Sequence, residues 1–375
     1  MMSIKDRKEG LSGIMRVKNE GKFVGACIDV VIDALDELIV VYNDCSDDTE
    51  DILRNKVRQY GDKVKIFPFN HNVLYSNLTM EQYEYAVSLP EDSPRLFCTQ
   101  CNYALEQANY QYAVKIDPDQ LYFADEVSAW REACLGQNVT INALQFIVAS
   151  LFRLWISFYR RMSTKVGKVC THLMPDWLIK ACKGAYMAYG RHMLYKGKMS
   201  IAWSGVNVFV EDGEIFIPYD FRNVHPPYNG EGDLVLFKIS QETKFCRYLV
   251  PGDKTKVLEF FNNPYPMFFS GPMWFHLHAN RDYCLDKVSQ MKQENPELFV
   301  PVDDFLTYSY NDSLAKMKNG IPTLFQRTLF LLVHKLGMSA VQRNTPLLRP
   351  IILQMFNQDK GSRSNLMEAT NENKL

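Results

Sequence analysis

This sequence lacks several features that would assign a chain of its length to a special class. Its 375 residues carry 42 Lys and Arg against 43 Asp and Glu, a formal net charge of −1, so overall charge indicates no particular partner. It has no run of about 18 uncharged apolar residues, so we predict no membrane-spanning helix. The first residues do not have the pattern of a signal peptide. We therefore expect a cytoplasmic protein, and in the absence of a nucleic-acid-binding motif we expect no nucleic acid as partner.

The sequence also lacks a cysteine framework. Its nine cysteines are odd in number and scattered, which is typical of a reducing compartment rather than of a disulfide-stapled domain. Cys98 and Cys101 form a single CxxC pair, with no second pair or histidine at the spacing of zinc ligands. We interpret this pair as small buried residues of a helix.

The first 125 residues alternate between predicted strands and helices. The apolar runs at 11–17, 37–42, 64–69 and 112–116 read as strands, with helical periodicity between them. This alternation predicts an α/β fold with a mostly parallel sheet and helices on both of its faces. Ligands of such sheets bind outside the carboxyl ends of the strands. Three polar clusters fall there, at 16–20, 43–49 and 117–120.

The third of these clusters, Asp117-Pro118-Asp119, carries two carboxylates at the end of a strand. Residues two apart on an extended chain project to the same side, so we expect the two carboxylates to lie together. Such a pair suits a divalent cation that keeps positions open for phosphate oxygens. The alternative is a solvated turn without a ligand.

The segment GIMRVKNEGKFVGACIDVVIDALDELIVVYNDCSDDTEDIL, followed by Asp117-Pro118-Asp119, resembles the opening of family-2-like GT-A glycosyltransferases of the bacterial surface-polysaccharide type. The resemblance covers about the first third of the chain. It implies a GT-A (Rossmann-like) domain that binds a nucleotide sugar, with Mn²⁺ or Mg²⁺ bridging the diphosphate. Tyr42 and Asn43 replace the two acidic residues of the family motif, and Asn43 can still hydrogen-bond to a pyrimidine edge.

The resemblance also implies roles for individual residues. The donor nucleotide is expected to contact residues of the two strand-end turns and the first acid of the later motif: Arg16, Lys18, Glu20, Tyr42, Asn43, Asp47 and Asp117. The metal ligands are expected to be Asp117 and Asp119 with His276 or His278. The general base is expected in the glycine-rich stretch 229–233, as Asp233 or, second, Glu231.

The segment from Arg153 to Lys198 contains ten Lys and Arg but one acid, Asp176, with aromatic residues interleaved. This composition favours an acidic acceptor or peripheral contact with an anionic membrane, on the inner face for a cytoplasmic protein. The alternative is a helical insertion with a solvated basic face. Residues 144–159 are apolar but interrupted by Arg153, which favours an interfacial or core helix.

We divide the chain into five parts: a nucleotide-sugar-binding half at 1–140, a basic helical insertion at 141–200, an acceptor half at 201–290, C-terminal helices at 291–356, and a polar tail at 357–375 that we expect to be disordered.

These patterns and the family resemblance together predict a metal-dependent glycosyltransferase, and the resemblance implies that it is inverting. It would transfer a hexosyl or N-acetylhexosaminyl group from a UDP-linked donor to a glycan or glycolipid. Three alternatives remain: a retaining transferase on the same fold, a nucleotidyltransferase, and a non-catalytic glycan- or membrane-binding protein with a decayed donor site. The nucleotidyltransferase is disfavoured because residues 16–20 lack the glycine of a phosphate loop.

Overall fold

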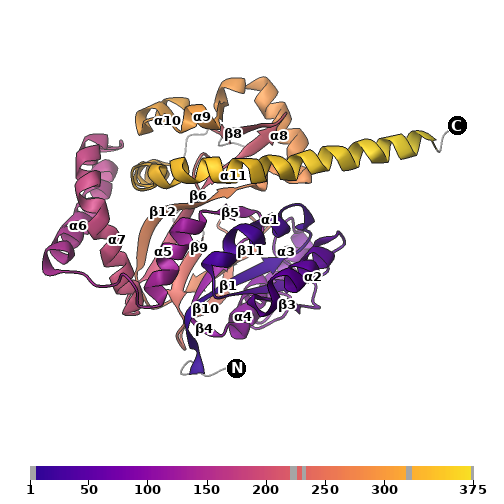
Figure 1. Ribbon diagram of the computed structural model, residues 1–375, viewed down its shortest axis with the longest axis horizontal. Coiled ribbons are helices and arrows are strands. Elements are labelled where there is room, and N and C mark those ends of the chain that lie inside the picture. Colours follow the sequence, from indigo (N-terminus) through magenta and orange to yellow (C-terminus); the bar gives the residue numbers. More distant parts are fainter. Residues whose placement is uncertain (1–5, 220–225, 230–233, 318–322, 373–375) are drawn as a thin grey trace.

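The computed structural model describes residues 6–219, 226–229, 234–317 and 323–372 (Figure 1), and it describes their side chains as far as residue 356, except at position 234. The helices on which the description below depends are α1 (Gly21–Val31), α2 (Thr49–Tyr60), α3 (Met80–Ser88), α4 (Phe97–Gln107), α5 (Ala124–Cys134), α6 (Ala143–Val166), α7 (Asp176–Tyr195), α8 (Asp282–Glu294), α9 (Val302–Phe305), α10 (Tyr310–Lys316) and α11 (Leu324–Glu372).

An eight-stranded sheet forms the centre of the molecule. Its order is β3 (Val64–Pro68), β2 (Glu37–Tyr42), β1 (Lys8–Val17), β4 (Tyr110–Ile116), β9 (Leu234–Lys238), β6 (Ser200–Asn207), β12 (Met267–His276) and β5 (Gln120–Tyr122). Four of the neighbouring pairs are parallel and three are antiparallel. The predicted α/β fold with a mostly parallel sheet is confirmed.

Both faces of this sheet are buried, which explains the continuous apolar runs in the sequence. Along β2, Leu38 and Val40 pack into one hydrophobic cluster with α1. Ile39 and Val41 pack into a second cluster with α4. Alternate residues thus point to opposite faces, and helices cover both faces as predicted.

Two small sheets flank the central one. Strands β10 (Lys244–Leu249) and β11 (Val257–Asn262) form an antiparallel hairpin. Strands β13 (Phe299–Pro301), β8 (Glu214–Pro218) and β7 (Phe209–Glu211) form a three-stranded sheet.

Helices α6 and α7 form a hairpin that stands at the opposite side of the molecule from α2 and β3 (Figure 1). A capping box of Asn142 and Gln145 begins α6, and Gly167 ends it with a φ of 73°. The hairpin lies in the predicted insertion 141–200. No helix in the described part of the chain is both long and apolar enough to cross a membrane.

Helix α11 runs across the molecule, and its C-terminal part extends beyond the rest of the chain (Figure 1). It includes the predicted tail as far as Glu372. The disorder expected for residues 357–375 concerns their behaviour in solution and stays a prediction.

Candidate active site

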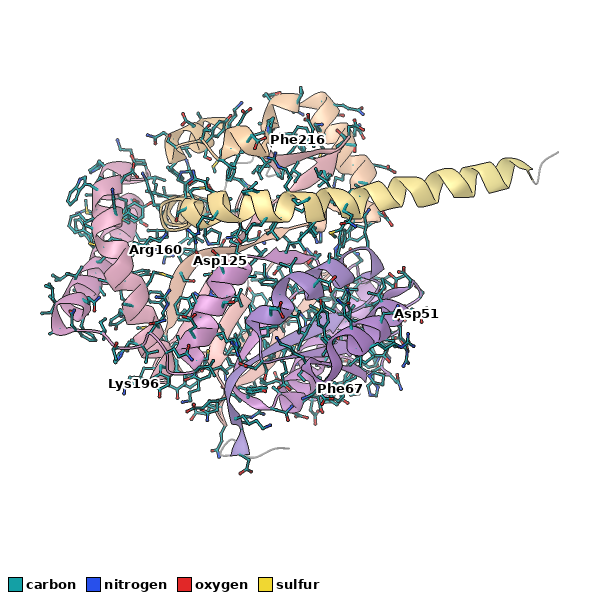
Figure 2. The ribbon with its side chains drawn as sticks, in the orientation of Figure 1. Asp51, Phe67, Asp125, Arg160, Lys196 and Phe216 are labelled. Atoms are coloured by element: carbon teal, nitrogen blue, oxygen red, sulfur yellow. The ribbon has the colours of Figure 1, made fainter. Side chains whose placement is uncertain are left out.

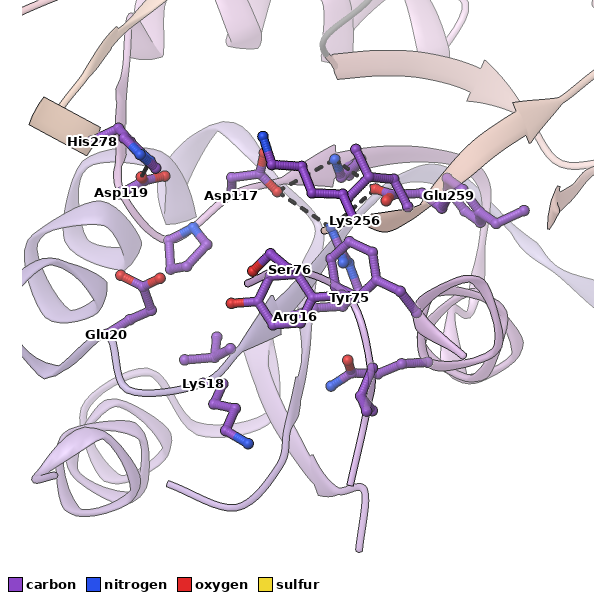
Figure 3. A pocket seen from close by; sticks show the side chains of 18 of the residues that line it. Arg16, Lys18, Glu20, Tyr75, Ser76, Asp117, Asp119, Lys256, Glu259 and His278 are labelled. Carbon is purple, nitrogen blue, oxygen red and sulfur yellow. Dashed lines mark hydrogen bonds and ion pairs between the residues drawn. The ribbon is translucent and has the colours of Figure 1, made fainter. Parts of the chain in front are cut away.

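A cavity of about 550 Å³ lies at the carboxyl ends of β1, β2 and β4, and the hairpin β10–β11 forms part of its wall. Figure 3 shows many of the side chains that line it. The three polar clusters of the sequence all contribute, through Arg16, Lys18 and Glu20, through Asn43, and through Asp117 and Asp119. These clusters meet because the strands are parallel, so that their carboxyl ends share one edge of the sheet.

Backbone pairing places two histidines beside Asp119. The chain turns at residues 118 and 119 and enters β5, which pairs antiparallel with β12 so that Gln120 lies opposite His276. The backbone N–H of Leu277 donates to the carbonyl of Asp119 at 2.8 Å. The segment 276–278 is therefore fastened to the turn that carries the carboxylate.

Asp119, His276 and His278 form a group of potential metal ligands. The Oδ2 atom of Asp119 lies 3.4 Å from Nε2 of His276 and 3.7 Å from Nδ1 of His278. One ligand atom from each of the three residues lies within 4.8 Å of the others, and no other such group of three occurs in the part of the chain that the structure describes. One carboxylate oxygen and two imidazole nitrogens suit Mn²⁺ better than Mg²⁺, which prefers oxygen ligands.

Neighbouring side chains hold His276 in the orientation that a metal ligand needs. Asn207 donates from its amide nitrogen to the carbonyl of Pro226, so its Oδ1 faces Nδ1 of His276 at 2.8 Å and accepts the imidazole proton. In the neutral imidazole the opposite nitrogen, Nε2, then carries the lone pair on the side of Asp119. This is the outer-shell arrangement that usually orients metal-binding histidines. In the protonated ring Nε2 pairs with the carboxylate of Asp119 instead.

The protonation states also suit a cation. Burial lowers the pKa of His278 from its usual value, and Arg281 lowers it further. Burial alone would raise the pKa of Asp119, but His276 and Arg281 hold it well below its usual range. A neutral imidazole and an ionised carboxylate are the forms that bind metal.

Sequence reasoning missed Arg281, which lies next to this group at the start of α8. Its Nη2 and Nε donate to Oδ2 of Asp119 at 2.9 and 3.2 Å, and Nη2 also pairs with Glu20. The guanidinium thus joins the end of β1 to the end of β4. Nothing in the sequence around 281 distinguishes this arginine from the first residue of an ordinary helix.

Asp117 takes part in a different cluster of charges. Its Oδ1 lies 3.7 Å from Arg16 and 3.6 Å from Lys115. Both cations also pair with Glu259 on β11, at 3.2 and 3.0 Å, and Arg16 lies over the ring of Phe97 at 3.6 Å. Figure 3 shows Asp117 turned toward this cluster and Asp119 toward His278.

The expectation that the two carboxylates share a side is therefore wrong, although both line the cavity. It assumed an extended chain, whereas residues 118 and 119 form a turn. A metal-binding role for Asp117 stays a prediction.

The residues at the end of β2 also differ in where their side chains lie: Asn43 lines the cavity, whereas Tyr42 and Asp47 do not. Asn43 is buried on the cavity wall, where its Oδ1 accepts from Gln100 at 2.9 Å. The hydroxyl of Tyr42 donates to the carboxylate of Glu50 at 3.3 Å. The carboxylate of Asp47 accepts hydrogen bonds from the backbone N–H groups of Gly21 and Thr49. Neither Tyr42 nor Asp47 belongs to the lining of this cavity. Their contacts with a donor stay predictions.

The predicted general bases, Asp233 and Glu231, lie outside the described residues. Asn229 belongs to the same glycine-rich stretch and is described by the structure. Its amide nitrogen lies 3.3 Å from Nδ1 of His276.

Comparison with known proteins bears on the first third of the chain, which carries Asp119 but not His276 or His278. Residues 3–127 match the family described as "Beta-1,4-N-acetylgalactosaminyltransferase (CgtA)", which is one third of the chain. No curated protein matches.

Two solved structures match part of the chain. TarS from S. aureus in complex with UDP is 18% identical, with a TM-score of 0.21, over 32% of this chain and 31% of that one. Glucosyl-3-phosphoglycerate synthase from Mycobacterium tuberculosis, in complex with Mn²⁺, UDP and glucosyl-3-phosphoglycerate, is 20% identical, with a TM-score of 0.19, over 30% and 34%. This chain thus spans about a third of the length of each.

The family match spans residues 13–53 and 117–119, the two segments on which the sequence-based resemblance depends. Over residues 3–127, this chain is confirmed to resemble a glycosyltransferase family.

Proposed function

We propose that the protein is a glycosyltransferase that moves a sugar from a UDP-linked donor to a hydroxyl of a glycan or glycolipid. The observation that carries this proposal is the Asp119, His276 and His278 group, which opens into the same cavity as Arg16 and Asn43. A cation site beside a pocket of nucleotide size is what a diphosphate donor requires.

The charges around the cavity suit the loss of a nucleoside diphosphate. When bound by Asp119 and the two histidines, Mn²⁺ or Mg²⁺ would stabilise the negative charge on the leaving group. Arg16, Lys18 and Arg281 add positive charge to the same wall. Because these cations are held in place before reaction, they need little reorganisation as charge develops.

The nucleotide base is proposed to lie near Asn43. Gln100 donates a hydrogen bond to the amide oxygen of Asn43. The amide nitrogen of Asn43 can therefore donate to a carbonyl oxygen of a pyrimidine. Asp117, held by Arg16 and Lys115, is proposed to contact the donor ribose or sugar.

We propose Asp233 as the base that deprotonates the acceptor hydroxyl, with inversion at the anomeric carbon, and Glu231 as the second candidate. Asp233→Asn should leave UDP affinity unchanged and abolish transfer. NMR of the anomeric product tests the stereochemistry, and a retained configuration would overturn the inverting assignment.

The decisive experiment is calorimetry of UDP binding with and without Mn²⁺, followed by transfer assays on a panel of nucleotide sugars. We expect UDP and Mn²⁺ to strengthen each other's binding, since linkage between two ligands is reciprocal. A protein with a decayed donor site would show no metal-linked nucleotide affinity, and that outcome would contradict the proposal.

Asp119→Asn tests the metal group directly. The substitution keeps the shape of the side chain but removes its charge, so we expect the fold to survive and transfer to fall by about 100-fold or more. Asp33→Asn is the control, because Asp33 is an exposed aspartate remote from the cavity. Unchanged Mn²⁺-dependent activity in Asp119→Asn would exclude the metal role.

A further inference from the structure

Helix α6 exposes an apolar stripe along one side. The members are spaced three or four residues apart, so they follow one face of the helix, and their exposed fractions range from 44 to 71%. They are Leu144, Ile147, Leu151, Leu154 and Phe158.

A different face of α6 packs against the protein. Ala149, Phe152 and Tyr159 are buried, and Tyr159 donates to the carbonyl of Thr328 on α11 at 3.0 Å. Arg160, near the junction of this hairpin with α11 (Figure 2), lies over the ring of Phe325. The stripe is therefore additional to the residues that hold the helix in place.

Two exposed tryptophans belong to the same hairpin. Trp155 is 39% exposed and Trp177 is 71% exposed. The indole of Trp155 donates to the carbonyl of Leu173 at 2.7 Å, which fastens the turn before α7 to the outer side of α6. Indole side chains are favoured where an apolar region meets water.

At the C-terminal end of α6 the apolar stripe is followed by basic side chains, and no acidic residue lies near them in the sequence. Residues 143–175 contain no Asp or Glu. Arg161 and Lys165 are exposed and follow Phe158 by three and seven residues, which places them on the side of the stripe. Lys168 and Lys180 are exposed nearby, and Asp176 is paired with Lys335.

We propose that α6 docks on an anionic lipid surface, with the stripe inserted among the acyl chains and Arg161 and Lys165 against the headgroups. A helix that is apolar on one side and basic beside it is typical of interfacial membrane binding. A second copy paired through the same stripe would bring more cations and no acid from α6, so charge favours lipid over self-association. This proposal does not depend on the proposed function.

The tryptophans provide a readout confined to this hairpin. The other three, Trp130, Trp203 and Trp274, are fully buried, so a change in emission on adding vesicles reports on Trp155 and Trp177. We expect a blue shift and co-sedimentation of the full chain with phosphatidylcholine vesicles that contain phosphatidylglycerol. Vesicles of phosphatidylcholine alone should bind it more weakly.

Paired variants separate the two contributions. Leu151→Gln with Leu154→Gln should weaken binding to anionic vesicles by about tenfold or more, because two inserted side chains are lost. Arg161→Gln with Lys165→Gln should remove most of the preference for anionic lipid. Leu347→Gln is the control, because Leu347 on α11 is 66% exposed, like the leucines of the stripe, and it should bind as the wild type does.

Three results would overturn the proposal. The first is an absence of binding to either vesicle, and the second is equal binding by wild type and the leucine pair. The third is a concentration-dependent dimer that the leucine pair abolishes, which would assign the stripe to a second copy. UDP binding measured on the same samples keeps a failure of lipid docking distinct from a failure of the donor site.

Discussion

At the scale of single residues, the site depends on the turn at residues 118 and 119, which directs the side chains of Asp117 and Asp119 to different partners. Asp119 is buried and meets two histidines and Arg281, whereas Asp117 is partly exposed and meets Arg16 and Lys115. Two aspartates separated by one proline thus have different surroundings. Their chemistry differs because surroundings, rather than residue type, decide which charged partner a carboxylate has.

Arg281 already pairs with the carboxylate oxygen of Asp119 that a bound metal ion would need. Its guanidinium donates to Oδ2, the atom that also faces both histidines. We expect Arg281→Gln to lower the melting temperature in EDTA, because Glu20 and Asp119 lose their buried counter-charge. We also expect Mn²⁺ to stabilise this variant more than it stabilises the wild type.

Thermal unfolding with EDTA and with Mn²⁺ measures both effects. Arg349→Gln is the matched control, because it removes an arginine paired with the largely exposed Asp303 and should change neither quantity. An equal response to Mn²⁺ in wild type and Arg281→Gln would show that the guanidinium does not oppose a cation there.

At the scale of elements, α7 packs closely against the central sheet at Gly190, where the absence of a side chain leaves room for an aromatic ring of β12. A Cβ atom at Gly190 would lie 2.6 Å from the ring of Phe268 on β12. Phe268 in turn stacks on Tyr186 of the same helix, with ring centroids 4.3 Å apart. This close approach seats the α6–α7 hairpin on the central sheet.

Two glycines of α7 give a matched test of this contact. Gly190→Ala should destabilise the protein by about 1–3 kcal/mol, because the ring of Phe268 must shift. Gly184→Ala should stabilise it by up to about 1 kcal/mol, because nothing lies within 4 Å of the added atom and alanine favours the helix. Urea unfolding of both variants measures the difference, and equal stabilities would contradict the close packing.

At the scale of the whole molecule, α11 connects parts of the chain that are distant in sequence. Its Phe356 packs with Phe23 of α1 at 6.4 Å between ring centroids. Its Gly337 lies against Pro272 of β12, and its His334 lies 2.7 Å from the hydroxyl of Tyr228. Helix α11 therefore joins α1, near the start of the chain, to the later strands.

The buried imidazole of His334 makes this junction sensitive to acid. Burial, with help from Lys335, lowers the pKa of His334 to about 4, whereas the unfolded chain has a histidine pKa of about 6.5. The unfolded state thus binds the proton first as pH falls. Stability from this group is complete above about pH 6.5 and is lost progressively toward pH 4, by on the order of 3 kcal/mol.

His334→Gln keeps a polar partner for Tyr228 and removes the titration. Urea unfolding between pH 7.5 and 4.5 should therefore show a shallower fall in stability for this variant than for the wild type. The exposed His172→Gln is the control. Identical pH dependence in wild type and His334→Gln would exclude His334 as the source.

Local patterns in the sequence were sufficient for the class of the fold and for the edge of the sheet where the site lies. Continuous apolar runs such as 37–42 require burial on both faces, and the alternation with helices requires parallel crossovers. The resemblance at residues 13–53 and 117–119, confirmed by the family match, also required no knowledge of distant contacts.

The resemblance implied that Asp119 lies with His276 or His278, more than 150 positions later in the chain. Only the tertiary structure decided that both histidines lie beside it, because β5 pairs with β12, and which other residues meet there. Arg281 and Glu259 enter the same cavity from α8 and β11, and Asp117 leaves the pair because the chain turns at 118 and 119. Residue types and local periodicity belong to the sequence alone, whereas the partners of a charge depend on strand pairing between distant segments, which no local pattern encodes.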